Sequence, residues 1–200
     1  MLKNSHPAGF VLAGGQSLRM GRDKALLEFR GKPLLLRTVE LLRPYVDRIT
    51  VLGSQSRYSH FGLRVLADEY PAQGPLGGIC MGLKNSLADW NIFLACDLPL
   101  LDGRILDALI RITSLTDAQA VVPKTRDGWQ PLCAAYQRSC VPAMEQAIER
   151  GNLALVNLLR SLRVEVLTAN HLFDSADWEE MFWNVNTTED WEGVQRNWRT

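Results

Sequence analysis

The sequence lacks several features that would place it in a specialised class. None of its 200 residues lies in an apolar run near the ~20 residues that a membrane-spanning helix needs, so we expect no membrane partner. The first residues lack the apolar stretch of a signal peptide, which favours a cytoplasmic location. No internal repeat or low-complexity linker interrupts the chain, and a single domain of this length can bury its own core.

Cysteine is scarce and net charge is absent. The cysteines Cys80, Cys96, Cys133 and Cys140 are separated by 16, 37 and 7 residues, which matches no zinc or redox spacing, so we expect buried or incidental thiols. The 22 basic and 22 acidic side chains cancel. This argues against a nucleic-acid partner, because domains that coat DNA or RNA are usually strongly basic. The balance is uneven along the chain, since residues 1–50 carry nine basic and four acidic side chains.

Short apolar runs alternate with helix-like segments along the whole chain. We expect strands at residues 9–13, 48–52, 63–67, 91–96, 120–122, 132–136, 163–167 and 182–185. We expect helices at residues 33–42, 76–87 and 102–110, and one or two more within 139–162. This alternation predicts a single α/β domain with a Rossmann-like, mostly parallel sheet and helices on both faces. Ligands of such sheets bind beyond the carboxyl ends of the strands.

The first expected strand leads into a glycine-rich segment with three cations. Gly14 and Gly15 carry no Cβ, so backbone amides can approach a phosphate closely. Arg19, Arg22 and Lys24 supply positive charge that suits a polyphosphate. The spacing is neither that of a Walker A loop nor that of a dinucleotide-binding loop. The alternative is a glycine turn beside a solvated basic patch.

Carboxylates follow two of the expected strands. Asp97 comes directly after the apolar run 91–96, where it can hold Mg²⁺ together with substrate phosphates. The alternative is an aspartate that merely starts a turn, although Asp102 is better placed to cap the next helix. Asp68 ends another expected strand and can face the same crevice or simply close a turn.

A third candidate site opens the helix expected near residue 76. The sequence Gly74-Pro75-Leu76-Gly77-Gly78 places glycines in the first turn, where free amides and the positive end of the helix dipole suit a nucleotide. The alternative at Gly77 is close packing of the helix against the sheet.

Taken in their order along the chain, the motifs of this sequence resemble those of one family. The first motif is similar to the signature of nucleotidyltransferases that activate sugars and pterins, and the full series resembles the molybdenum cofactor guanylyltransferases, a MobA-like family, over residues 9–192. The motifs are Leu12-Ala13-Gly14-Gly15, Arg19-Met20-Gly21, Asp23-Lys24, Gly74-Pro75-Leu76, Cys96-Asp97-Leu98-Pro99, Gln130-Pro131-Leu132 and Asn184-Val185-Asn186-Thr187. Two departures are Thr188, where the family often has proline, and Gly53 or Ser54, where it can place a nucleotide-binding asparagine.

The resemblance implies an activity and its partners. It implies a fold of the nucleotide-diphospho-sugar transferase type and transfer of GMP from GTP to the phosphate of molybdopterin, with or without bound molybdenum, releasing pyrophosphate. It implies Mg²⁺ or Mn²⁺ as the metal. Residues from about 8 to 115 would bind the nucleotide and those from about 116 to 200 the acceptor. Transient contact with proteins of cofactor biosynthesis, or with acceptor proteins, fits such a role.

We assign residue roles from the motifs and the resemblance together. The catalytic candidates are Arg19, Lys24 and Asp97, with Asp97 as the metal ligand. Asp23 is expected either to orient Lys24 or to be a surface acid. The nucleotide-binding candidates are Leu12, Ala13, Gly14, Gly15, Lys24, Asp68, Gly77 and Asp97. The acceptor-binding candidates are Gln130, Asn184 and Asn186. For Asn184 and Asn186 the alternative is a role as turn residues before the last helix.

Two rival functions fit the same sequence features. One rival is a cytidylyltransferase or sugar-phosphate nucleotidyltransferase of the same fold, and the other is a non-catalytic nucleotide sensor.

For Trp129, Trp178 and Trp183 we expect core packing rather than stacking on a pterin. The acids Asp177, Glu179 and Glu180 are expected to be solvated.

Overall fold

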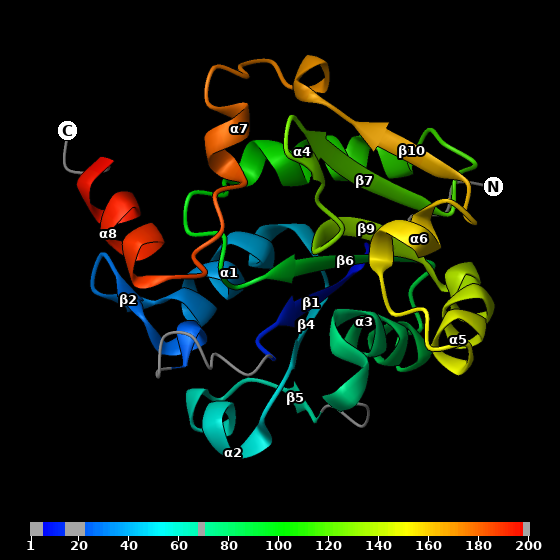
Figure 1. Ribbon diagram of the computed structural model, residues 1–200, viewed down its shortest axis with the longest axis horizontal. Helices are drawn as coiled ribbons and strands as arrows, with labels where there is room; N and C mark the ends of the chain where they lie inside the picture. The colour runs from blue at the N-terminus through cyan, green and yellow to red at the C-terminus, as the bar shows by residue number, and fades with distance from the viewer. Residues whose placement is uncertain (1–5, 15–22, 68–70, 198–200) are drawn as a thin grey trace.

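A single sheet forms the centre of the molecule. The computed structural model describes residues 6–14, 23–67 and 71–197. Its strands follow the order β10-β7-β9-β6-β1-β4-β5, and β8 pairs with β7 outside this row (Figure 1). β9 runs antiparallel to both β6 and β7, and the other neighbours in the row are parallel, which confirms the mostly parallel sheet. The strands are β1 (Ala8–Leu12), β4 (Arg48–Leu52), β5 (Val65–Leu66), β6 (Trp90–Ala95), β7 (Ala120–Thr125), β8 (Gly128–Trp129), β9 (Cys133–Gln137) and β10 (Val164–Leu167).

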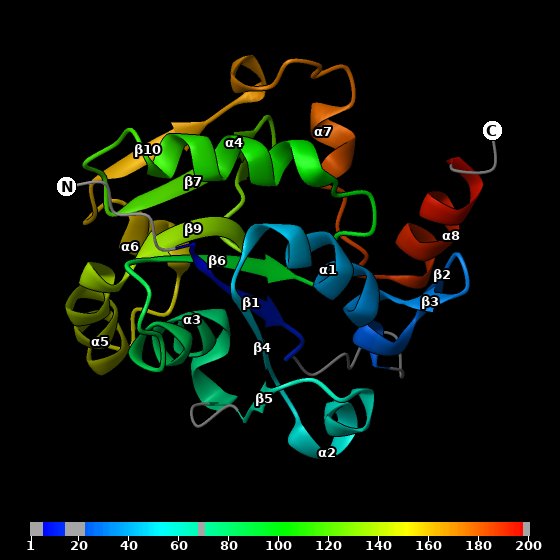
Figure 2. The same ribbon diagram turned by 180° about the vertical axis from the view of Figure 1, so that it is seen from behind.

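Helices cover both faces of the sheet, as the alternating pattern predicts (Figure 2). α1 (Leu34–Leu42) and α4 (Gly103–Thr113) pack on one face, where Val11 of β1 is buried. α3 (Gly74–Lys84), α5 (Val141–Glu149) and α6 (Leu155–Leu159) pack on the other, where Phe10 of β1 is buried. Successive residues of a strand point to opposite faces, so a strand buried on both sides reads as a continuous apolar run.

Local chemistry explains where the helices begin. Asp102 caps α4 as expected, because its Oδ1 accepts a hydrogen bond of 2.9 Å from the backbone amide of Arg104. The buried positions Ile105, Leu109 and Ile112 recur at helical spacing and face the sheet. Pro33 lies at the N-cap of α1, one position before the first turn in which we expected it.

A small separate core joins two distant parts of the chain. The hairpin of β2 (Glu28–Phe29) and β3 (Lys32–Pro33) packs against α8 (Thr188–Asn197). Phe29, Leu34, Val185 and Val194 are buried between them. Burying their apolar surface holds the residues after Asp23 beside those that precede α8, and both groups contain candidate site residues.

The strand expected at residues 182–185 is wrong. This segment connects α7 (Trp178–Met181) to α8 without strand pairing, although the backbone amide of Val185 donates to the carbonyl of Asp97 at 2.9 Å. Phe182 and Val185 are buried by packing, which the pattern alone does not distinguish from a strand. The hairpin of β2 and β3 and the strand β8 were not expected, because each element has only two residues.

The structure tests the expectations for the cysteines and the tryptophans. All four cysteines are free and buried, as expected from their spacing. Trp178 is buried, while Trp129 and Trp183 pack against the cores as partly buried side chains, in line with the packing role that we expected. Within the described ranges, no helix is both long and apolar enough to cross a bilayer.

Candidate active site at the carboxyl edge of the sheet

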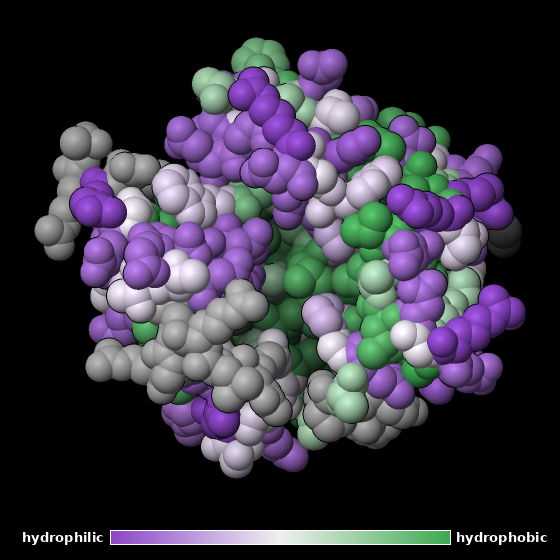
Figure 3. All heavy atoms as spheres, in the orientation of Figure 1, coloured by the Kyte–Doolittle hydropathy of each residue, from purple (hydrophilic) through white to green (hydrophobic). Residues whose placement is uncertain are grey.

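The site is built around the end of β1, between the ends of its two neighbours. The amide of Ala13 donates to the carbonyl of Leu52 at 3.0 Å, and the amide of Cys96 donates to the carbonyl of Leu12 at 3.2 Å. Gly14 follows on the exposed side of this edge. Figure 3 shows a hollow with a hydrophobic floor near the middle of the same view, where β1 and β6 end in Figure 1. The candidates Leu12, Ala13 and Gly14 therefore lie where ligands of parallel sheets bind.

Asp97 lies directly beyond β6 and is partly buried. Its Oδ1 is buried with no hydrogen-bond partner among the described residues, and its carbonyl is held by the amide of Val185. Burial raises the pKa of Asp97, while nearby Lys24 and a backbone hydrogen bond act in the opposite direction. A buried carboxylate oxygen without a partner is uncommon, and a hard cation is one group that would satisfy it.

Lys24 reaches the same edge from the short 3-10 turn Lys24–Leu26. Asp23 caps this turn, because its Oδ1 accepts a hydrogen bond of 3.1 Å from the amide of Ala25. The Lys24 Nζ donates to Oδ1 of Asn186 at 2.8 Å across 162 residues of sequence. The structure thus brings together three predicted site residues, Lys24, Asp97 and Asn186. An ammonium has three N–H donors, so one bond to Asn186 does not exhaust them.

A capping box fixes the backbone around Asn186. Oδ2 of Asp190 accepts hydrogen bonds of 2.8 Å from the amides of both Asn186 and Thr187, and Oγ1 of Thr187 accepts one of 3.1 Å from the amide of Asp190. Burial alone would raise the pKa of Asp190, but these donors and nearby Lys24 hold it below its usual value. The sequence did carry a signal for this contact, because a threonine followed three residues later by an acid marks a helix start.

Gln130 and its neighbours lie beside the end of β6. The carbonyl of Leu132 accepts a hydrogen bond of 2.8 Å from the amide of Ala95, which places Leu132 beside the last residue of β6, two positions before Asp97. The Gln130 Nε2 donates to Oγ1 of Thr125 at 3.0 Å, so the hairpin of β7 and β8 orients this side chain. Asn184 donates to the carbonyl of Phe182 at 3.3 Å, a contact that also suits its alternative role in a turn.

The start of α3 closes the other side of the edge. Gly77 is buried in the first turns of the helix. A Cβ at the adjacent Gly78 would come within 3.4 Å of the Leu12 side chain, which is closer than most such contacts. Close packing therefore explains part of the glycine content here, and a role for Gly77 in nucleotide binding stays a prediction.

Several predicted residues lie outside the described ranges. These are Gly15, Arg19, Arg22 and Asp68. The described residues that flank the first three are Gly14 and Asp23.

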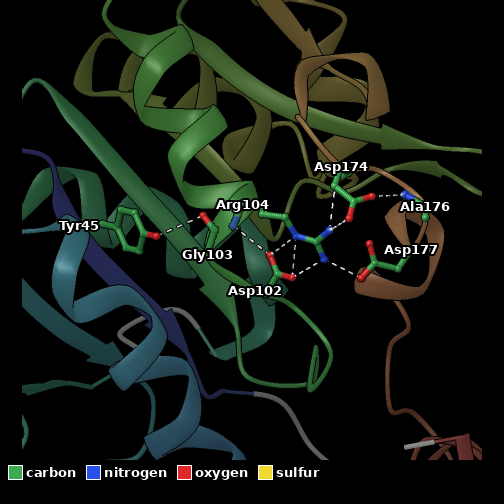
Figure 4. A network of polar contacts seen from close by, with 7 residues as sticks. All are labelled: Tyr45, Asp102, Gly103, Arg104, Asp174, Ala176 and Asp177. Atoms are coloured by element: carbon green, nitrogen blue, oxygen red, sulfur yellow. Dashed lines mark hydrogen bonds and ion pairs between the residues drawn. The ribbon is translucent and has the colours of Figure 1, made fainter.

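A polar network on α4 was not anticipated from the sequence. Figure 4 shows the guanidinium of Arg104 between Asp102, at the start of its own helix, and Asp174 and Asp177, which precede α7. Its Nη2 donates to Oδ2 of Asp177 at 2.6 Å, and its Nη1 donates to the carbonyl of Asp174 at 3.1 Å. Asp177 is thus not merely solvated. The same correction applies to Glu179 of α7, which accepts a hydrogen bond of 3.1 Å from the amide of Arg126.

The described residues favour a metal site that is shared with a ligand. No group of three or more His, Cys, Asp or Glu side chains within the described ranges could hold a cation by itself. Mg²⁺ commonly takes one or two carboxylates and completes its shell with substrate phosphates and water. The unpartnered Oδ1 of Asp97 fits that mode of binding.

Comparisons with known proteins agree with this architecture. The family model "MobA-like NTP transferase domain" matches residues 9–166. A probable molybdenum cofactor guanylyltransferase of Clostridium perfringens is 31% identical over 92% of this chain and 93% of its own length. A molybdenum cofactor guanylyltransferase of Syntrophotalea carbinolica is 35% identical over 93% of this chain and 89% of its own.

The fold comparison agrees with the sequence comparison. The crystal structure of molybdopterin-guanine dinucleotide biosynthesis protein A from Archaeoglobus fulgidus superposes with a TM-score of 0.81 at 22% identity, covering 95% of this chain and 97% of that one. With the site described above, the findings define an α/β enzyme of the nucleotidyltransferase class. The chain belongs to the MobA-like NTP transferase family.

Proposed function

We propose that the protein transfers GMP from GTP to the phosphate of molybdopterin and releases pyrophosphate. The names of its relatives support the substrates. The observation that carries the proposal is the contact between Lys24 and Asn186 beside Asp97. It joins the glycine-rich nucleotide motif to the carboxyl-terminal motif at one point, as a transfer between two bound phosphates requires.

The reaction needs positioning and charge stabilisation more than a reactive side chain. A phosphate oxygen of molybdopterin attacks the α-phosphorus of GTP and forms a new P–O bond. The bond from the α-phosphorus to the oxygen bridging to the β-phosphorus breaks, and pyrophosphate leaves with that electron pair. The attacking phosphate is already ionised at neutral pH, so no general base is required. By analogy with phosphoryl transfer, the protein's contribution is alignment and electrostatics.

Cations and backbone amides neutralise the triphosphate in this proposal. Lys24 and Arg19 bind the phosphates and stabilise negative charge on the leaving pyrophosphate. Amides of residues 12–15 line the nucleotide, with Asp68 and Gly77 on the guanosine side. The ammonium of Lys24 is already held at the end of β6 by Asn186, which limits the reorganisation needed when GTP binds.

Asp97 is the residue that would hold the metal. Its buried Oδ1, which has no hydrogen-bond partner in the part of the chain that the structure describes, supports that role. When bound, Mg²⁺ or Mn²⁺ would supply positive charge that offsets the negative charge of the substrate phosphates. Asp97 itself holds its carboxylate at a fixed place beyond β6, because the backbone on either side is bonded to neighbouring segments.

The acceptor is bound by the second part of the chain in this proposal. Gln130, Asn184 and Asn186 offer amide groups that both donate and accept hydrogen bonds, as a pterin edge or a phosphate requires. Residues from about 8 to 115 bind the nucleotide and those from about 116 to 200 the acceptor. The proximity of Gln130 to the end of β6 supports this division.

An assay of nucleotide choice tests the proposal. The protein is incubated with Mg²⁺, molybdopterin and each of GTP, CTP, ATP and UTP in turn, and released pyrophosphate is measured. We expect release with GTP that requires molybdopterin. Release with CTP would indicate a cytidylyltransferase, release with a sugar phosphate in place of molybdopterin would change the acceptor, and GTP binding without release would indicate a sensor.

A further inference from the structure

The hydroxyl of Tyr58 connects the backbone just after β1 with the residue just before Lys24. Tyr58 lies at the end of α2 (Gln55–Tyr58), and its hydroxyl is 2.7 Å from the carbonyl of Ala13. The same hydroxyl is 2.9 Å from Oδ2 and 3.2 Å from Oδ1 of Asp23. Ala13 directly follows β1, and Asp23 directly precedes Lys24. One side chain from a third segment therefore links Ala13 to Asp23.

The position of this hydroxyl is fixed by burial. Tyr58 is 1% exposed and belongs to the main core. A phenol carries one proton, so Ala13 and Asp23 share a single donor. Burial, together with the hydrogen bond to Asp23, raises the pKa of Tyr58 well above its ordinary value, and the hydroxyl stays protonated.

The ring of Tyr58 is held as firmly as its hydroxyl. A Cβ placed on Gly53 would lie 2.8 Å from Cε2 of Tyr58 and 3.3 Å from the backbone carbon of Ala13. Real Cβ atoms essentially never approach other atoms that closely, so this position has no room for a side chain. The ring therefore occupies space beyond the end of β4 that any larger residue at position 53 would need.

We propose that Tyr58 is a positioning residue that fixes the backbone at Ala13 and the side chain of Asp23 beside Lys24, so that these groups are pre-organised for a nucleoside triphosphate. This inference rests on the proposed function, because it takes the triphosphate to bind beside Ala13 and Lys24. Tyr58 acts through Ala13 and Asp23 and does not touch the ligand. Groups that are already held in place lose less conformational freedom when a ligand binds to them.

The substitution Tyr58→Phe tests the proposal because it removes the hydroxyl and keeps the ring. We expect the Kd for GTP with Mg²⁺, measured by titration calorimetry, to rise roughly fivefold to tenfold, as for the loss of one well-placed hydrogen bond. The KM for GTP should rise in parallel, and the KM for molybdopterin should stay the same. A merely structural role would lower the melting temperature and leave both constants of the folded enzyme unchanged.

Tyr136→Phe is a matched control. Tyr136 is also fully buried, and its hydroxyl also donates to a backbone carbonyl, that of Pro131 at 2.8 Å. The two variants should lose similar stability, because each loses one buried hydrogen bond. Only Tyr58→Phe should weaken the binding of GTP. Equal weakening in both variants would overturn the proposal.

A double-mutant cycle with Asp23→Asn separates the hydrogen bond between Tyr58 and Asp23 from other roles of Asp23. Asparagine keeps an oxygen for the amide of Ala25 and weakens the acceptor for Tyr58. Arg57→Gln measures the exposed ion pair of Asp23 with Arg57 separately, and we expect little change there. If the hydrogen bond between Tyr58 and Asp23 carries the effect, the double variant Tyr58→Phe with Asp23→Asn should bind GTP no more weakly than whichever single variant binds it less tightly. Additive losses would contradict a shared contact.

The outcomes distinguish this proposal from the proposed function. A wild-type protein that binds no nucleoside triphosphate would overturn both. If wild type binds and transfers GMP while Tyr58→Phe binds GTP equally well, only the role of Tyr58 falls. Should another triphosphate prove to be the substrate, the same variants measured with that nucleotide decide the role of Tyr58.

Discussion

At the scale of single residues, Asp97 is held where its own charge is disfavoured. Burial raises the pKa of Asp97, and its Oδ1 has no partner among the described residues. A carboxyl group with a raised pKa in the folded state binds its proton more tightly there than in the unfolded chain. As the pH rises above the ordinary pKa of an aspartate, ionisation of Asp97 therefore lowers the free energy of unfolding. The whole of this loss is reached once the pH exceeds the raised pKa. At neutral pH, the protein tolerates this cost at a position suited to a cation.

This leads to opposite expectations for stability and activity in Asp97→Asn. The neutral side chain removes the buried charge, so the metal-free variant should resist urea better than wild type by ~1 kcal/mol at pH 7. The same variant should release no pyrophosphate, because it lacks the carboxylate that holds the metal. Asp117→Asn, at an exposed position near the opposite edge of the sheet, should change neither property. Wild-type turnover by Asp97→Asn would remove Asp97 from the reaction.

Lys24 provides the second expectation at this scale. Lys24→Met keeps the length of the side chain and removes its charge, so GTP with Mg²⁺ should bind roughly tenfold to a hundredfold more weakly, as for the loss of a charge-assisted hydrogen bond. Lys32→Met is the control, because Lys32 of β3 forms a solvent-exposed ion pair of 2.7 Å with Glu40 of α1. Calorimetry of both variants measures the effect. Unchanged affinity in Lys24→Met would mean that another cation binds the triphosphate.

Some site residues could be predicted from sequence and others could not. Asp97 and Lys24 follow strand ends or glycine-rich motifs, and the topology of a parallel sheet gathers such positions at one edge. Tyr58 carries no such signal, because its contacts with Ala13 and Asp23 span 45 and 35 residues and depend on how α2 packs. The role of Arg104 was equally invisible, since its partner Asp177 is 73 residues away.

At the scale of elements, α7 is held in place by contacts at both of its sides. Arg104 of α4 binds the residues that precede α7, and Glu179 within α7 binds the amide of Arg126 in the turn between β7 and β8. The chain then runs from α7 through residues 182–187, which contain Asn184 and Asn186. The hairpin of β7 and β8 also orients Gln130 through Thr125. The position of α7 is thus coupled to every candidate acceptor residue.

We therefore expect Arg104→Lys to affect the acceptor side selectively. A lysine keeps the charge but cannot donate to Asp102, Asp174 and Asp177 from one planar group. The KM for molybdopterin should rise roughly fivefold, as for the loss of ~1 kcal/mol of positioning, and the Kd for GTP should stay unchanged. Arg111→Lys is the matched control, because Arg111 donates from the same helix to the carbonyl of His171, farther from the site. Equal effects on both substrates would contradict this coupling.

The helices and strands that were predicted correctly are those that an apolar pattern or a boundary residue such as glycine marks in the sequence. β4 matches its expected position, because an apolar run marks it. α5 and α6 lie within residues 139–162, where one or two helices were expected, and Gly151 with its positive φ separates them. The segment 182–185 was misread, because apolar residues are buried there without strand pairing. The antiparallel direction of β9 was not expected either, as its residues are as apolar as those of a parallel strand.

At the scale of the whole molecule, the distribution of charge matters more than the sum. The net charge is zero, yet a lysine and a partly buried aspartate lie near each other at one edge of the sheet. Two distant parts of the sequence complete this edge, because the small core of Phe29, Leu34, Val185 and Val194 holds the residues near Lys24 beside those near Asn186. Overall composition could not predict this arrangement, because it depends on which strand ends become neighbours.

The central claim concerns which bond of GTP breaks and which forms, and a labelling experiment tests it most directly. The protein is incubated with molybdopterin, Mg²⁺ and GTP labelled with ³²P at either the α- or the γ-phosphate, and the products are separated. The account predicts that the α-label appears in a dinucleotide with molybdopterin and the γ-label appears in pyrophosphate. Transfer of the γ-label to molybdopterin, or α-label found only in free GMP, would contradict it.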